Sequence, residues 1–202
     1  KLYINGNASL GDIKIYLLPH STLTFIANQN KEITNVQGEK EIIEFFSVDS
    51  GYEIGICKDA KLTCEKGIIF NQKTNVYNCG TISARLVEFN NDSKFINDGK
   101  VTLADLFSCE NSTSTVENNG EITAGYFHLA GTSSFYNTST GIVHISKKSL
   151  ISSNSSTWNN DGYFHSKDMK FASNSKNWIN KCKLYVEELL DIQTSNGTIV
   201  MD

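Results

Sequence analysis

The sequence predicts an all-β protein whose chain winds into a right-handed parallel β-helix, a solenoid built of turns about 20 residues long with three short strands each. Three observations predict this fold. One motif recurs at a nearly constant interval, short runs of alternating apolar and polar residues follow each copy, and helix-forming residues are not enriched. Because a turn of this length cannot bury its apolar face alone, the copies must stack along an axis.

Each copy of the motif places a large apolar residue two positions before an asparagine, and successive asparagines are 19 to 23 residues apart. Asparagine amides stacked at one corner are expected to bond to the copies above and below. We interpret the large residues as an inward-facing core column. The six pairs are Val76 and Asn78, Phe95 and Asn97, Val116 and Asn118, Phe135 and Asn137, Trp158 and Asn160, and Trp178 and Asn180.

A glycine follows the asparagine by two or four residues in all copies but the last, where Cys182 takes its place. We expect these glycines to supply the positive φ of a sharp corner. Apolar and mostly polar residues then alternate, which is typical of a strand with one buried face. The glycines are Gly80, Gly99, Gly120, Gly141 and Gly162, and the inward positions that follow are Ile82, Val101, Ile122, Val143, Phe164 and Leu184.

Residues 1–202 are predicted to form a single β-helix domain of unequal regularity. Residues 67–202 carry the regular turns, whereas residues 1–66 carry strand-like runs without the full motif. The polar and charged stretch near residues 29–41 predicts a loop or an insertion between turns. Because the chain opens on Lys1 without a signal-like apolar stretch, we expect a processed product or a fragment of a longer protein.

Composition excludes several classes of function. Charged residues make up 20% of the chain and the net charge is −4, which argues against a nucleic-acid partner. No run of 18 apolar residues is present, so no membrane-spanning segment is expected. The acidic residues that share a phase, Asp98 and Asp161, stand three turns apart, so no catalytic carboxylate pair is expected. We therefore predict that the chain is not an enzyme and uses no cofactor and no metal.

The best candidate binding residues lie on the outward side of the predicted strands. His144 and His165 each follow a corner glycine by three residues in adjacent turns. Thr123 precedes and Tyr185 follows them at the same phase, so no third metal ligand is at hand. With Tyr163, directly after its glycine, these residues offer an aromatic and polar face to a carbohydrate or a protein. The predicted binding residues are His144, His165, Tyr163 and Tyr185.

Five cysteines occur without a Cys-x-x-Cys pair, so a zinc site is not expected. We expect a disulfide within the set Cys57, Cys64 and Cys79. Its connectivity stays open, because Cys57 can bridge to Cys79 across one turn or to Cys64 as a local closure. An odd cysteine count leaves at least one thiol free or paired outside the chain.

Six Asn-x-Ser/Thr sequons accompany a composition of 22 Asn, 22 Ser and 16 Thr residues, which favours a secreted glycoprotein. The sequon at Asn137 belongs to the corner column, which would hide it. The remaining candidates for N-glycosylation are Asn7, Asn91, Asn111, Asn154 and Asn196.

Phrases such as Asn97-Asp-Gly-Lys-Val-Thr102 and Asn118-Asn-Gly-Glu-Ile-Thr123 resemble the N-terminal effector domains of yeast adhesin-like cell-wall proteins, the hyphally regulated cell-wall protein family. The resemblance is clearest over residues 67–202. It implies a right-handed β-helix displayed at the cell surface, carried on a Ser/Thr-rich stalk with a glycosylphosphatidylinositol anchor, and a role in adhesion and biofilm.

The expected function is therefore that of an extracellular adhesin module of a yeast cell wall. It would attach without catalysis to glycans or proteins of host or neighbouring cells, or to abiotic surfaces. Two alternatives stay open at this point. One is a carbohydrate-active β-helix enzyme, a polysaccharide lyase or glycoside hydrolase, and the other is a bacterial or phage surface-fibre β-helix.

Overall fold

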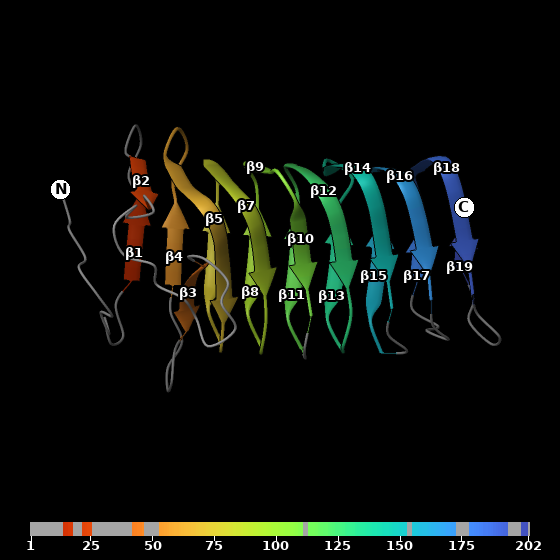
Figure 1. Cartoon of the computed structure of the whole chain (residues 1–202), viewed down its shortest axis with the longest axis horizontal. Helices are drawn as coiled ribbons and strands as arrows, with labels where there is room; N and C mark the ends of the chain where they lie inside the picture. Colours follow the sequence, from red (N-terminus) through yellow and green to blue (C-terminus); the bar gives the residue numbers. More distant parts are fainter. Residues whose placement is uncertain are drawn as a thin grey trace.

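A computed structural model describes residues 14–17, 22–25, 42–46, 53–110, 113–152, 155–172, 178–193 and 199–201. These residues form a β-solenoid in which parallel strands stack in about 6 turns, which confirms the predicted β-helix (Figure 1). The described part of the chain contains no helix, and hence no helix long and apolar enough to cross a membrane.

The strands form two parallel sheets. The nine-stranded sheet contains only short strands, and the other sheet contains the long strands together with a few short ones. In order, the first sheet holds β1 (Lys14–Leu17), β4 (Glu53–Ile56), β6 (Asn75–Asn78), β8 (Lys94–Asn97), β11 (Thr115–Asn118), β13 (Ser134–Asn137), β15 (Thr157–Asn160), β17 (Trp178–Asn180) and β19 (Ile199–Met201). The second holds β18 (Lys183–Ile192), β16 (Tyr163–Phe171), β14 (Ile142–Ile151), β12 (Glu121–Leu129), β10 (Leu106–Cys109), β7 (Thr81–Phe89), β5 (Lys61–Asn71) and β2 (Thr22–Phe25), with β3 (Ile42–Phe46) and β9 (Lys100–Leu103) pairing beside this path.

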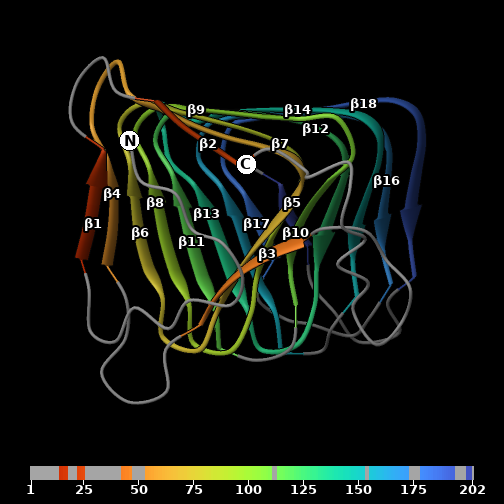
Figure 2. The same ribbon diagram turned by 60° about the vertical axis from the view of Figure 1, so that its left-hand side comes forward.

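The three strands predicted for each turn are present, but two of them are usually joined into one. Figure 2 shows β14, β16 and β18 running along one side of the solenoid and bending onto the next. The bend is marked by shifts in register, for example between Ala124 and Tyr126 in β12 and between Ile145 and Lys148 in β14. β9 and β10 remain separate where one turn changes direction, as do β2 and β3, which pair with the two ends of β5. The corner is thus a β-bulge rather than a break in the strand.

The N-terminal strands belong to the same two sheets. β1 pairs with β4, while β2 and β3 both pair with β5, β2 at its beginning and β3 at its end. β2 and β3 therefore lie side by side with one strand, β5, in the same turn. The predicted loop or insertion at 29–41 lies outside the described residues.

Large apolar side chains fill the interior, as the motif predicts. Phe95, Phe135, Trp158 and Trp178 are all 0% exposed. Rings from the two sheets pack against each other across the solenoid, with Phe89 and Phe95 stacked at 4.6 Å between centroids and Phe171 against Trp178 at 4.7 Å. This column is the core and not a ligand surface.

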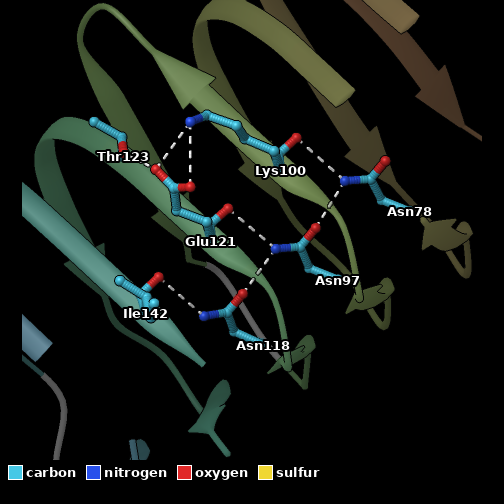
Figure 3. A network of polar contacts seen from close by, with 7 residues as sticks. All are labelled: Asn78, Asn97, Lys100, Asn118, Glu121, Thr123 and Ile142. Atoms are coloured by element: carbon cyan, nitrogen blue, oxygen red, sulfur yellow. Dashed lines mark hydrogen bonds and ion pairs between the residues drawn. The ribbon is translucent and has the colours of Figure 1, made fainter. Parts of the chain in front are cut away.

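The corner asparagines form a buried ladder that runs along the solenoid. Each side-chain Nδ2 donates to the Oδ1 of the asparagine in the next turn, at 2.7 Å from Asn78 to Asn97 and from Asn97 to Asn118 (Figure 3). The bond from Asn118 to Asn137 follows at 2.8 Å. The same pattern continues through Asn160 to Asn180. Because a side-chain amide carries two donor hydrogens, Nδ2 also bonds to backbone oxygens such as Lys100 O at 3.3 Å.

The corner glycines are needed for close packing, which corrects the predicted positive φ. Among the described glycines only Gly131 has a positive φ. A Cβ added at Gly120 would lie 2.1 Å from the carbonyl oxygen of Gly99, and one added at Gly99 would lie 2.2 Å from that of Gly80. Successive turns thus approach each other backbone to backbone at this corner, where any side chain would collide.

The predicted disulfide is not formed, because none of the five cysteines is joined to another by a disulfide in the structure. Cys64 faces the core, where its Sγ lies 3.3 Å from Gly67 O, and so it is separated from the corner that carries Cys57 and Cys79. Cys57 and Cys79 directly follow the paired residues Ile56 and Asn78.

Of the predicted glycosylation sites, only Asn91 lies within the described residues. Its side chain is exposed and its φ is 49°, and its Nδ2 donates to Asn71 Oδ1 at 2.7 Å. Asn7, Asn111, Asn154 and Asn196 lie outside the described residues. The sequon at Asn137 is buried at 1% exposure in the ladder, as predicted.

Candidate functional site

The structure brings the four predicted binding residues together on the outer face of the sheet of long strands. His144 in β14 pairs in register with His165 in β16, which pairs with Tyr185 in β18. Tyr163 lies two residues before His165 on the same strand, and hence on the same face. We call His144, Tyr163, His165 and Tyr185 the aromatic platform.

The rings of the aromatic platform contact one another. His165 lies at the centre, with its ring centroid 5.2 Å from that of Tyr185, 5.7 Å from that of His144 and 6.4 Å from that of Tyr163. His144 and Tyr163 close the group at 5.3 Å. These separations are typical of tilted or edge-to-face aromatic pairs, so the four rings form one continuous surface.

Hydrogen bonds orient the two histidines. The Nδ1 atoms of His144 and His165 lie 3.5 Å apart, so that one ring donates and the other accepts. On its other side, His165 Nε2 lies 3.0 Å from the Oε1 atom of Glu187. Since each ring nitrogen of His165 has a partner, the central ring is held in one orientation.

The aromatic platform is partly open to solvent. Tyr185 is 55% exposed, whereas the side chain of His165 is 20% exposed at the centre. The sequence prediction missed two residues that complete the site, Glu187 and Ile142. Ile142 pairs in register with Tyr163 and is 40% exposed. Ile142 could have been found in the sequence from its position directly after Gly141. Glu187 could have been found from its place two residues after Tyr185, on the same face.

The aromatic platform has a polar boundary toward the N-terminus. In the preceding turn, Thr123 pairs in register with His144, and Glu121 pairs with Ile142. One turn earlier, the corresponding residues are Thr102 and Lys100. Lys100 Nζ bonds to Glu121 Oε1 at 3.0 Å, and the Thr123 hydroxyl donates to the same oxygen at 3.3 Å (Figure 3). This exposed ion pair contributes less than about 1 kcal/mol. The rings are thus confined to the turns from β14 onward.

A second feature lies beyond the bend of the same strands. A shallow depression of about 310 Å³ has Lys147, Lys148 and Lys167 among its lining residues. Lys147 Nζ sits 4.7 Å from the ring centroid of Tyr126, a cation–π contact. Because Lys147 and Lys148 are exposed and Lys167 pairs with Glu188 at 3.2 Å, the depression presents solvated charge rather than a shaped pocket.

Metal ligands and acidic pairs do not gather within the described residues. No group of three His, Cys, Asp or Glu side chains there is placed to hold a metal ion. Asp98 accepts a bond from Asn119 Nδ2 at 2.8 Å, and Asp161 lies 3.6 Å from Lys181 Nζ. Each of the two acids that share a phase therefore has its own local partner.

Comparison of the chain with protein-family models, with curated proteins and with solved structures finds no match. The residues and their geometry therefore carry the functional argument.

Proposed function

We propose that this chain is an extracellular adhesin module of a yeast cell wall that attaches to carbohydrate surfaces through the aromatic platform. The resemblance of its turns to adhesin-like wall proteins supports the cellular setting. The observation that carries the proposal is the continuous surface of four rings, held by the His144–His165 contact and the His165–Glu187 bond.

Carbohydrate is the ligand class that suits this surface best. A sugar ring has an apolar face of C–H groups and a rim of hydroxyls. The aromatic platform offers the complement, because its rings are apolar on their faces and carry hydroxyl and imidazole groups at their edges. Lys183 and Glu187 stand beside Tyr185 and add charged partners at the rim. A shallow, open surface of this kind binds one ligand weakly and gains strength from many copies.

Binding of the purified chain to a glycan array and to yeast wall polysaccharides tests the proposal, with release of soluble sugar assayed in the same wells. The double substitution Tyr163→Ala/Tyr185→Ala is expected to reduce binding at least about tenfold, the loss of more than 1.4 kcal/mol. Tyr77→Ala is the matched control, because Tyr77 is 40% exposed on the nine-stranded sheet.

Binding that depends on Tyr163 and Tyr185 but not on Tyr77 supports the proposal. Equal loss in the control variant, or no binding to any glycan, contradicts it. Release of sugar from the polysaccharides would favour a carbohydrate-active enzyme instead.

A further inference from the structure

Three polar side chains from three successive turns form a connected line on the outer face, separate from the aromatic platform. Glu110 directly follows β10, His128 lies in β12, and Ser152 directly follows β14. The Nδ1 atom of His128 is 2.5 Å from Glu110 Oε1, and its Nε2 atom is 2.9 Å from Ser152 Oγ. A histidine is thus held between a carboxylate on one ring nitrogen and a serine hydroxyl on the other.

The stacking of turns creates this arrangement. Cys109, Leu129 and Ile151 pair in register, so the residues that follow them occupy one column: Glu110, Ala130 and Ser152. Because Ala130 has only a methyl group, the ring of His128, two residues earlier, can lie between the other two side chains. Backbone bonds of Ala130 N to Cys109 O at 3.0 Å and Ser152 N to Leu129 O at 2.9 Å hold the turns in place.

The carboxylate is anchored on its other side as well. Ser108 Oγ donates to Glu110 Oε1 at 2.6 Å. The pKa of the Glu110 carboxyl lies below its ordinary value, mainly because it accepts a hydrogen bond from His128, although burial opposes this shift. An ionised Glu110 accepts the proton of Nδ1, which leaves the lone pair of Nε2 directed at the Ser152 hydroxyl. This is the relation among acid, base and nucleophile that activates a serine.

The site is open enough for a substrate. The side chains of Glu110 and His128 are 32% and 26% exposed. Ser152 is flanked in its column by Ala130 and by Ala172, whose backbone N bonds to Ile151 O at 2.8 Å. Two methyl groups beside the hydroxyl leave room for a short apolar acyl group.

We propose that Ser152 is a nucleophile activated by His128, with Glu110 as the positioning residue, and that this site hydrolyses esters of short acyl groups. Ser152 Oγ bonds to the acyl carbon while its proton passes to His128 Nε2. The ester C–O bond then breaks, and the alcohol leaves with that proton. Water attacks the acyl-serine with His128 as base, releases the carboxylic acid and restores the Ser152 hydroxyl.

Among the described residues, the other two histidines, His144 and His165, lack this arrangement. His165 bonds to Glu187, but its second nitrogen faces the ring of His144 and not a hydroxyl. The nucleophile is therefore assigned to the Glu110–His128–Ser152 line, and the inference does not depend on the proposed adhesin function.

Treatment of the full chain with a fluorophosphonate probe, followed by intact-mass and peptide mass spectrometry, tests the assignment. We expect one adduct on Ser152, absent in Ser152→Ala, and slow hydrolysis of p-nitrophenyl acetate that the adduct abolishes. His128→Ala is expected to slow labelling about 100-fold or more, the usual contribution of a general base. Ser146→Ala, which removes an exposed hydroxyl from β14, the strand that precedes Ser152, is expected to label at the wild-type rate.

Glu110→Gln distinguishes positioning from simple structural support. It is expected to slow labelling at least about 10-fold. Long-range proton–nitrogen NMR should at the same time show the His128 ring leaving its Nδ1–H form, with the fold unchanged by circular dichroism. No adduct, an adduct on another serine, or labelling of Ser152 at the same rate in folded His128→Ala would overturn the proposal.

Discussion

Two columns of side chains run along the same turns, the buried asparagine ladder and the outward column from Ser83 to Tyr185. They differ in whether the residue type stays the same from one turn to the next. The ladder repeats one residue type in every copy, from Asn78 to Asn180. The outward column changes from serine and threonine to histidine and tyrosine over the same distance. A buried amide without a partner costs free energy, whereas an outward side chain is solvated whatever its type. The outer face is therefore where this solenoid can vary its chemistry.

The largest expected effect comes from the core beside the ladder. Trp158→Ala should reduce the free energy of unfolding by about 3–5 kcal/mol, because it removes a fully buried ring. Chemical denaturation monitored by circular dichroism measures the loss. Trp158→Phe is the control, and it should cost much less, since the buried indole Nε1 of Trp158 has no hydrogen-bond partner to lose. A loss under about 1 kcal/mol for Trp158→Ala would mean that the ring does not support the core.

The corner glycines should be nearly as sensitive. Gly120→Ala places a methyl group 2.1 Å from a backbone oxygen that cannot move aside without shifting a whole turn. Overpacking of this kind typically costs about 1–3 kcal/mol. The measurement is the melting temperature of Gly120→Ala compared with that of Gly125→Ala. The Cβ added at Gly125 would lie 3.0 Å from the nearest oxygen. Equal melting temperatures for the two variants would refute the close-approach explanation.

The ladder itself should show a smaller loss. Asn118→Ala leaves the Nδ2 of Asn97 and the Oδ1 of Asn137 without their partners in the column, at an expected cost of about 1–2 kcal/mol. Thr123→Ala, five residues later on the outer face, should change the free energy of unfolding by less than about 0.5 kcal/mol. If denaturation curves give the two variants the same stability, the contrast between buried and outward columns fails.

The smallest effect concerns acid on the outer face. Because the pKa of Glu110 is lowered in the folded protein, the unfolded chain binds a proton more readily there, and stability rises with pH through that window. The stabilisation that the ionised Glu110 provides is fully present above pH 4.5, the ordinary pKa of its carboxyl, and is lost as the pH falls below that value. Glu110→Gln should therefore show a shallower loss of stability than wild type between about pH 5 and pH 3. Parallel pH profiles of urea denaturation for the two proteins would argue against the Glu110–His128 bond.

The cysteines also differ in reactivity according to whether they lie in the interior or on the surface. Burial raises the pKa of Cys109 to about 12, so that this thiol carries almost no thiolate at neutral pH. Cys79 and Cys182 are exposed at the corner. The sequence could count the cysteines but could not tell which of them faces the core.

By itself, the sequence determined the solenoid, its repeat, the core column, the asparagine ladder and the membership of the aromatic platform. It could do so because residues at one phase of a regular repeat must meet in adjacent turns, whatever the rest of the chain does. Tertiary structure decided what phase alone leaves open. It decided that the corner glycines serve close approach rather than positive φ, that β2 and β3 share one turn, and that Cys64 is turned away from Cys57 and Cys79.

The Glu110–His128–Ser152 line depended on tertiary structure most of all. Its members are 18 and 24 residues apart, because His128 stands two positions before the column that its partners share. The contact requires the bare methyl of Ala130 between them and the reach of an imidazole across two turns. Both requirements depend on the volume and direction of side chains in the stacked turns, which the periodicity of the sequence does not reveal.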